Sequence, residues 1–523
     1  MSWRRLLDDD VRAAAAARPH AAAVVAATPL SYAQLDRAAD GFAAALRARG
    51  VARGDRVAIA MANASETVAA LYGCWRAGAA VVPLNPSVKA DKLGRVLAHC
   101  AASAVVCDEQ LAATAEAARA HAASVRVVVA VPRSGAFETL FAGDAAAAVD
   151  HAPALSEDLA LVLYTSGSTG EPKGAMLTHA NVRFAVDSIV EYLELTPEDR
   201  VLSVLPLSFG YGLSQLLTCV RAAATLVLER GFAFPGRVVE LFERERVTGF
   251  AAVPTIFQVL TSLSGLAERE LPHLRYLTNA GAGLSSEALA AVRRTFAGAQ
   301  LYSMYGQTEC IRISYLPPDQ LDVRPDSVGV AIPGTEVWIA DEDGREVAPG
   351  EVGELMVRGA HVMQGYWQAD ALTADRLRPG RWPWERVMAT GDLFRRDEEG
   401  FLYFVSRRDD IIKSRGEKVA PREVEEALIA ASGVAVAVVA GVPDRLLGEA
   451  VCAFVVADDG AELDPAALRR HCATRLEDYM VPQHVIVREE VPTTPNGKVD
   501  RRALVREHLD AARAEDTSRS PRV

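Results

Sequence analysis

Short apolar runs alternate with helix-like segments along the first part of the chain. Apolar runs at residues 56–61, 80–85 and 104–108 are separated by amphipathic segments at 66–77 and 92–100. Such alternation is typical of βαβ units, whose parallel strands are buried on both faces and read as continuous apolar runs. Further runs of this kind lie at residues 159–164, 201–205, 225–228 and 250–253. The pattern predicts an α/β fold of βα layers around a largely parallel sheet.

The pattern changes twice after this region. Beyond about Gly329, short strand-like runs are separated by Gly, Pro and Asp turns, which predicts a β-rich subdomain. A short α/β unit follows, with helices expected at residues 421–431 and 465–475 and strands at 434–439 and 449–456. We therefore expect three parts: a large N-terminal domain of residues 1–407, a small mobile C-terminal domain of residues 408–505, and a charged tail of residues 506–523.

Composition narrows the class of protein. A chain of 523 residues exceeds one compact core, and its net charge of −12 argues against nucleic acid as a partner. We expect no signal peptide and no transmembrane segment, because no apolar run approaches the roughly 20 residues that span a bilayer. The seven cysteines are scattered without CxxC spacing, which predicts reduced thiols, no structural zinc and a cytoplasmic location.

A Gly/Ser-rich loop directly follows one of the apolar runs. Residues 164–174 read YTSGSTGEPKG. Gly167 and Gly170 allow the backbone to approach a ligand closely, and exposed N–H groups in such a turn bind anions. The loop lacks the spacing of a Walker A motif and of a GxSxG nucleophile elbow. A flexible linker is the plain alternative, but the preceding strand and the terminal Lys173 favour a triphosphate cradle.

Four further short motifs follow in the chain: YGQTE at residues 305–309, TGD at 390–392, SRRDDIIK at 406–413 and PTTPNGK at 492–498. An aromatic ring can stack on adenine, and a carboxylate together with phosphate oxygens suits Mg²⁺. Each motif alone has an ordinary alternative, such as a packed tyrosine, an Asx turn, a charged strand end or a solvated lysine. The four motifs together are stronger evidence for a nucleotide-binding enzyme than any one of them alone.

Taken in order along nearly the whole chain, these motifs resemble the adenylate-forming superfamily of acyl- and aryl-CoA synthetases, amino-acid adenylation domains and luciferases. Ser406 is one departure, because glycine is usual at that position. The resemblance implies an AMP-forming acid–thiol ligase that uses ATP, Mg²⁺ and coenzyme A. Such an enzyme joins a carboxylic acid to AMP, releases pyrophosphate, and then transfers the acyl group to a thiol.

The resemblance also implies roles for individual residues. The ATP and AMP ligands would be Thr165, Ser166, Gly167, Ser168, Thr169, Gly170, Lys173, Gly281, Tyr305, Gly306, Asp392 and Arg407. The catalytic residues would be Thr308, Glu309, Lys413 and Lys498, with Glu309 and Thr169 on the metal. Asp409 would be the hinge, and Gly416 and Lys418 would face the thiol acceptor. Rotation about Asp409 would exchange Lys498 for the face around Gly416 between the two steps.

The acyl pocket is expected in two segments, residues 207–215 and 279–283, by the same resemblance. Its lining would be Phe209, Gly210, Tyr211, Ser214, Asn279 and Ala280. Amino-acid adenylation domains carry an Asp where this chain has Gly210, and a buried ammonium without that partner would be costly. We therefore expect a fatty or aryl acid rather than an α-amino acid. Tight backbone packing is the alternative explanation for each small residue.

Three other functions could use parts of this sequence pattern. An acyl-AMP ligase that loads the phosphopantetheine of an acyl carrier protein presents the same thiol chemistry, so the motifs hardly separate it from a CoA ligase. A non-catalytic binding protein would have no need for Lys173, Glu309, Asp392, Arg407 and Lys498 together. A serine hydrolase would need a His and an Asp against Ser168 and would work without ATP.

Overall fold

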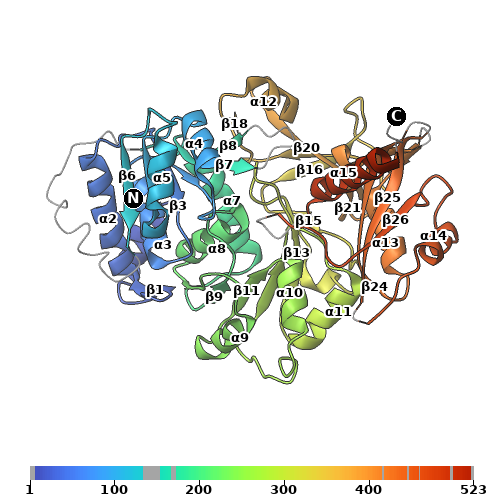
Figure 1. Cartoon of the computed structure of the whole chain (residues 1–523). Coiled ribbons are helices and arrows are strands. Elements are labelled where there is room, and N and C mark those ends of the chain that lie inside the picture. Colours follow the sequence, from blue (N-terminus) through green and yellow to red (C-terminus); the bar gives the residue numbers. More distant parts are fainter. Residues whose placement is uncertain are drawn as a thin grey trace. The chain divides into compact units, whose positions relative to one another are not determined.

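The structure is a computed structural model, and it describes residues 6–132, 154–165, 172–414, 417–444, 447–458, 460–494 and 499–519. The chain divides into two compact units (Figure 1). The first comprises Met1–Val337 and Val357–Ala389, and the second comprises Trp338–Met356 and Thr390–Val523. The domain limits expected at residues 407 and 505 stay predictions.

The first unit contains a seven-stranded sheet in the order β18-β8-β7-β4-β3-β5-β6. The strands are β3 (Arg56–Ala60), β4 (Ala80–Pro83), β5 (Ala104–Asp108), β6 (Val127–Val131), β7 (Leu159–Thr165), β8 (Lys173–Thr178) and β18 (Gly365–Tyr366). Strands β3 to β7 are parallel to their neighbours, whereas β8 and β18 are antiparallel additions. Strands β3, β4, β5 and β7 are largely buried, which explains their unbroken apolar sequences, whereas β6 at the edge of the sheet is mostly half-buried.

The same unit contains a nine-stranded sheet in the order β15-β14-β13-β12-β11-β9-β10-β1-β2. Its strands are β1 (Ala22–Val25), β2 (Leu30–Ser31), β9 (Arg200–Ser203), β10 (Thr225–Leu228), β11 (Gly249–Ala252), β12 (Tyr276–Asn279), β13 (Gln300–Tyr305), β14 (Ser314–Tyr315) and β15 (Val330–Ala331). From β1 to β13 neighbouring strands run parallel. Four parallel neighbours, β9, β11, β12 and β13, therefore end at one edge.

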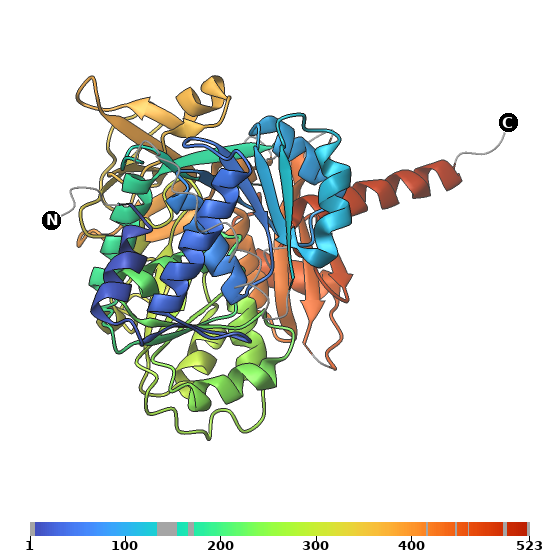
Figure 2. The ribbon, with the colours of Figure 1, turned by 90° about the vertical axis from the view of Figure 1, so that its left-hand side faces the viewer.

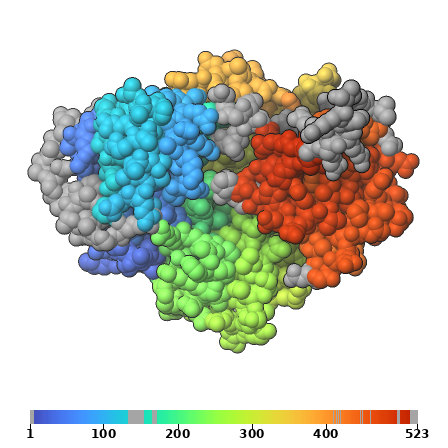
Figure 3. All heavy atoms as spheres, viewed as in Figure 1, coloured from blue at the N-terminus to red at the C-terminus, as the bar shows by residue number. Residues whose placement is uncertain are grey.

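Helices connect these strands, as the alternating pattern predicted. They are α1 (Asp9–Ala17), α2 (Tyr32–Ala48), α3 (Ser65–Arg76), α4 (Ala90–His99), α5 (Ala112–Arg119), α7 (His179–Tyr192), α8 (Gly210–Arg221), α9 (Pro235–Arg244), α10 (Pro254–Thr261), α11 (Ser286–Thr295) and α12 (Asp370–Arg376), with the short strand β19 (Leu377–Pro379) after α12. The green surface in Figure 3 belongs to the part of the chain that carries α9 to α11.

The second unit contains most of β16 (Glu336–Ala340), β17 (Gly353–Arg358) and β20 (Arg386–Arg396), together with β21 (Leu402–Arg407). A further sheet has the order β23-β22-β25-β24, with β26 beside β25. These elements and their helices are β22 (Ile412–Ser414), β23 (Glu417–Val419), β24 (Val434–Asp444), β25 (Gly448–Ala457), β26 (His484–Arg488), α13 (Pro421–Ile429), α14 (Pro465–Ala473) and α15 (Arg501–Arg519). Val424 and Leu428 of α13 pack against Val439 of β24 in its core.

The expected fold class is confirmed, and two details differ from the expectation. The apolar runs form two parallel sheets rather than one, because an apolar run shows that a strand is buried but not which strand it pairs with. Residues 506–519, expected to be a tail, lie in α15, the red helix seen along its length in Figure 2. Leu504 in its first turn is fully buried, which anchors this helix to the second unit.

Two observations bear on the expectations drawn from composition. All seven cysteines are buried free thiols. Across the described ranges, no helix combines the length and the apolar content that crossing a membrane requires.

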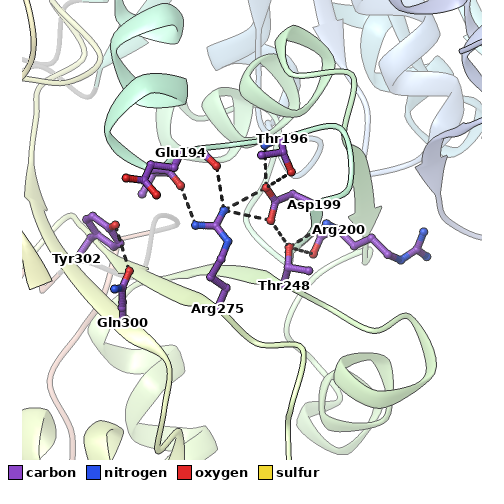
Figure 4. Close-up of polar contacts among 9 residues, drawn as sticks. Glu194, Thr196, Asp199, Arg200, Thr248, Arg275, Gln300 and Tyr302 are labelled. Carbon is purple, nitrogen blue, oxygen red and sulfur yellow. Dashed lines mark hydrogen bonds and ion pairs between the residues drawn. The ribbon is translucent and has the colours of Figure 1, made fainter.

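A buried carboxylate fixes the amino ends of three strands of the nine-stranded sheet (Figure 4). Asp199, which is 4% exposed, precedes β9. It accepts two hydrogen bonds, of 3.0 and 3.1 Å, from Arg275 before β12 and one of 2.6 Å from Thr248 before β11. Arg275 also donates to the carbonyl oxygen of Leu193 after α7. One charged cluster therefore connects the segments that enter these strands.

We expect Asp199→Ala to lower the free energy of unfolding by about 2–3 kcal/mol, because Arg275 and Thr248 lose their shared acceptor. Urea-induced unfolding followed by tryptophan fluorescence measures this change. Asp322→Ala is the matched control, since Asp322 pairs with Arg293 on the surface and should matter by less than about 0.5 kcal/mol. Equal effects of the two variants would contradict the assignment of a structural role to Asp199.

Candidate active site

The carboxyl edge of the nine-stranded sheet brings three of the predicted segments together. Parallel pairing places Ala252 opposite Asn279 and Asn279 opposite Ser303. The chain leaves β12 into residues 280–283 and leaves β13 into the YGQTE segment, while α8 begins after β9. Ligands of parallel α/β sheets bind at the carboxyl ends of the strands. The pattern of strands predicted this edge, and the registers show which segments are neighbours.

The YGQTE segment is a compact turn after β13. The amide of Ile311 donates to the carbonyl oxygen of Gln307 at 2.7 Å, and the amide of Ile313 donates to that of Tyr305 at 2.9 Å. The side chain of Gln307 donates to the hydroxyl of Tyr305 at 3.1 Å. A Cβ atom at Gly306 would lie 2.4 Å from the carbonyl oxygen of Ile311, so only glycine allows this turn to close.

Glu309 is held by a tyrosine that the motifs did not include. Its carboxylate is 7% exposed, and Oε1 accepts a 2.6 Å hydrogen bond from the hydroxyl of Tyr366 in β18. The amide of Met363 donates to the carbonyl oxygen of Glu309, which fixes the same segment to the turn. Burial, and then the neighbouring Glu309 charge, raise the pKa of Tyr366, so this hydroxyl stays protonated and remains a donor.

Arg376 supports this pair from α12. Its Nε lies 3.4 Å from the Tyr366 hydroxyl, and its terminal nitrogen donates to the carbonyl oxygen of Ala389 at 2.9 Å. Tyr366 and Arg376 lie far from the YGQTE motif in sequence, and a tyrosine in a short apolar strand looks like an ordinary core residue. The sequence offered no signal that would have assigned either residue to the site.

The acyl segment begins α8. The hydroxyl of Tyr211 lies 2.7 Å from Thr278 Oγ1 and donates to the carbonyl oxygen of Thr278 at 2.9 Å, which holds α8 against the end of β12. Ser214 donates to the carbonyl oxygen of Tyr211, so its hydroxyl is used within the helix. Phe209 is the N-cap residue of the helix. Tyr211 is therefore the predicted pocket residue that ties this segment to the sheet.

The two glycines of the acyl segment have different surroundings. A Cβ atom at Gly212 would lie 2.2 Å from the carbonyl oxygen of Pro206, whereas one at Gly210 would meet nothing within 4 Å. Tight packing therefore accounts for Gly212 but not for Gly210. At the other segment, Asn279 is fully buried and donates to the carbonyl oxygen of Ala282, and Ala280 beside it is also buried.

The predicted phosphate loop connects two paired strands. Thr165 at the end of β7 lies opposite Lys173 at the start of β8 in an antiparallel pair, so the expected strand before the loop is confirmed. Lys173 is half-buried. The loop residues Ser166, Gly167, Ser168, Thr169 and Gly170 lie outside the described residues, as does the Thr165 side chain.

Two of the predicted nucleotide ligands, Asp392 and Arg407, meet in the second unit. Asp392 in β20 pairs with Arg407 in β21, and Nε of Arg407 lies 3.3 Å from Oδ1 of the buried Asp392. The amide of Asp392 donates to Thr390 Oγ1 within the TGD motif. Glu354 accepts hydrogen bonds from the amide of Gly391 and from Arg408, which fixes both strands beside the pair.

The remaining predicted residues are described only in part. The backbones of Lys413 in β22 and Lys418 in β23 lie opposite each other, and Asp409 lies in a 3-10 turn before β22. The side chains of these three residues, together with Gly416 and Lys498, lie outside the described part of the structure. Their predicted roles stay predictions. Among the described residues, no group of three or more His, Cys, Asp or Glu side chains is placed to hold a metal ion.

Comparisons with known proteins agree with this architecture. The family model described as AMP-binding enzyme matches residues 11–367, and the model of the AMP-binding enzyme C-terminal domain matches residues 423–498. The chain is 36% identical over 487 residues to a feruloyl-CoA synthase of an Amycolatopsis species, covering 92% of this chain and 94% of that protein. It is 33% identical over 478 residues to the indoleacetate–CoA ligase of Aromatoleum aromaticum, covering 90% and 91%.

A solved structure is similar over the same length. ATP-bound MatB from Rhodopseudomonas palustris has a TM-score of 0.89 and 29% sequence identity, covering 97% of this chain and 99% of that one. The family model extends over more than half of the chain and includes the strands and turns that build the carboxyl edge. The chain therefore belongs to the adenylate-forming AMP-binding enzyme family, as its ordered motifs predicted.

Proposed function

We propose that this protein is an ATP-dependent ligase that adenylates a fatty or aryl carboxylic acid and transfers the acyl group to the thiol of coenzyme A. AMP and pyrophosphate are the other products. The observation that carries the proposal is the buried carboxylate of Glu309, which Tyr366 fixes in the turn that follows the adenine-stacking candidate Tyr305. Two relatives named as CoA ligases of aromatic acids support the thiol and the aryl class.

Glu309 has the chemistry that a magnesium ligand needs. Tyr366 occupies Oε1, and no other hydrogen bond to this side chain is found among the described residues, so Oε2 remains for a cation. Mg²⁺ prefers one or two carboxylates together with phosphate oxygens, and when bound it neutralises charge on those oxygens. We assign Glu309 and Thr169 to the metal, and Thr308 to the substrate carboxylate or α-phosphate.

Positive charge must reach the site from this chain as well, because the carboxylate and the triphosphate repel each other. Lys173 at the start of β8 would hold phosphate oxygens, and Lys498 would lie between the carboxylate and the α-phosphorus during the first step. Asp392 would accept hydrogen bonds from the ribose hydroxyls, and Arg407 would hold the nucleotide beside it. Asp392 is buried and already oriented by the hydrogen bond within the TGD motif, so it needs little rearrangement to accept these bonds.

The second step is thiol attack on the acyl-adenylate, with AMP as the leaving group. Asp409 would be the hinge, and Gly416, Lys413 and Lys418 would lie beside the entering thiol arm. The space at Gly210 suits an alkyl chain or a ring rather than an α-amino acid, which would need an anionic partner there. The alternative function is loading of a carrier protein, and the products of the reaction distinguish it from a CoA ligase.

The first test measures pyrophosphate release with ATP and Mg²⁺ across fatty, aryl and amino acids, with and without coenzyme A. We expect acid-dependent release and a CoA thioester, and we expect Lys498→Ala to reduce the adenylation rate by at least about 100-fold because it removes charge at the reacting centre. Lys92→Ala, on the exposed face of α4, is the matched control and should be neutral. Release without any CoA thioester would favour the carrier protein, and no release with any acid would contradict the proposal.

Tyr366→Phe should raise the Mg²⁺ concentration for half-maximal pyrophosphate release by about 10-fold, because a hydrogen bond to a charged group contributes roughly 1.5–3 kcal/mol. The same variant should weaken Mn²⁺ binding in the presence of ATP, measured by electron paramagnetic resonance. Tyr403→Phe is the control, since it removes a similar hydrogen bond to Asp397 in the other unit. An unchanged metal dependence of Tyr366→Phe would show that Tyr366 does not position a metal ligand.

A further inference from the structure

Arg312 is a buried positive charge, with 2% of the residue exposed. Within the described ranges it forms no ion pair, and its Nε finds no hydrogen-bond partner there. A guanidinium remains protonated in proteins, so this residue cannot avoid the cost of burial by losing its proton. An unpaired buried charge is strongly unfavourable, and the residue therefore needs an explanation beyond packing.

Two neutral tyrosines lie beside Arg312. Its guanidinium lies over the ring of Tyr211, 5.3 Å from the ring centroid. Burial raises the pKa of Tyr192 to about 12, although the charge of Arg312 and a hydrogen bond with its side chain oppose this shift, and burial also raises the pKa of Tyr211. Both hydroxyls are therefore protonated near neutral pH. A cation–π contact compensates part of the desolvation, but no residue described here supplies a negative charge.

The position of Arg312 connects the two halves of the proposed site. It lies three residues beyond Glu309, and a Cβ atom at Gly306 would come within 3.0 Å of its Cα atom. Its guanidinium covers Tyr211, which lies within the acyl segment. Tyr211 follows Gly210, the glycine that close packing does not explain. The charge is therefore held beside the segment assigned to the acyl group rather than in the distant core.

We propose that Arg312 binds an oxygen acceptor on the acyl group of the substrate, at the end remote from the reacting carboxylate. The preferred acids then carry a second carboxylate or a phenolic or carbonyl oxygen there, and a second carboxylate would neutralise the charge most completely. This inference rests on the proposed function and narrows its substrate class. Plain hydrocarbon acids leave the guanidinium unpaired and are the disfavoured substrates.

Matched acids test the inference. We expect kcat/KM for pyrophosphate release to be at least about 10-fold higher for terephthalate or 4-hydroxybenzoate than for benzoate, or for adipate than for hexanoate. Arg312→Met keeps a long side chain of similar size without the charge. It should reduce kcat/KM for the oxygen-bearing acids by at least about 10-fold while changing the plain acids by less than about 3-fold. Comparison of the dicarboxylic acids with the hydroxy acid shows whether Arg312 prefers a second carboxylate or a phenolic oxygen.

Thermal unfolding of the ligand-free protein gives an independent measurement. Arg312→Met should unfold at the same temperature as the wild type or at a higher one, because it removes an unpaired buried charge. Arg76→Met is the control, since Arg76 is equally buried but pairs with Asp8 and Asp36, and it should lower the unfolding temperature. If Arg312→Met lowered the unfolding temperature as much as Arg76→Met does, Arg312 would be a structural residue and the inference would be overturned.

Failure of the inference and failure of the proposed function look different. If the wild type activates plain acids as well as oxygen-bearing ones, and Arg312→Met leaves the ratio unchanged, the inference is wrong and the ligase assignment stands. If no acid in the panel supports pyrophosphate release, the proposed function is contradicted and the inference falls with it. If the wild type prefers oxygen-bearing acids and Arg312→Met abolishes this preference, the result supports both the inference and the proposed function.

Discussion

The parallel register of the nine-stranded sheet is the constraint on which the site depends. Strands β9, β11, β12 and β13 are paired side by side in one direction, so their carboxyl ends reach one edge. Asp199 fixes the opposite ends of three of these strands by accepting hydrogen bonds from Arg275 and Thr248. The hydrogen bonds that connect these strands at their amino ends therefore lie at the far edge of the sheet, where the sequence shows no functional motif.

The turn after β13 places two buried charges close together in sequence and stabilises each in a different way. Glu309 accepts a hydrogen bond from the neutral hydroxyl of Tyr366, and Arg312 lies over the ring of Tyr211. Among the described residues the two charges are not paired with each other. A direct ion pair would have stabilised the empty site, but it would also have consumed the charges that ligands need. Neutral partners hold both groups in place and leave each charge for the ligand that we propose for it.

The sequence predicted what depends on local pattern. The strands at residues 104–108 and 225–228 were predicted with their observed bounds, and the strand before the phosphate loop is present. Tyr366 could not be predicted in this way, because its partner Glu309 lies 57 residues away and no periodicity connects them. The division into two sheets was missed for the same reason. Local composition shows that a residue is buried, whereas partners are decided by packing between distant segments.

The same limit applies to residues of one type within one segment. Gly210 and Gly212 look alike in the sequence, and each has the same two explanations: space for a ligand or close backbone packing. The structure separates them, because Gly212 faces a carbonyl oxygen at a distance that excludes any side chain, whereas Gly210 faces none. Close packing requires a glycine at Gly212. It does not explain why position 210 is a glycine, and it does not explain the charge on Arg312. These two features lie beside Tyr211 and are best explained by the acyl ligand that we propose for this part of the molecule.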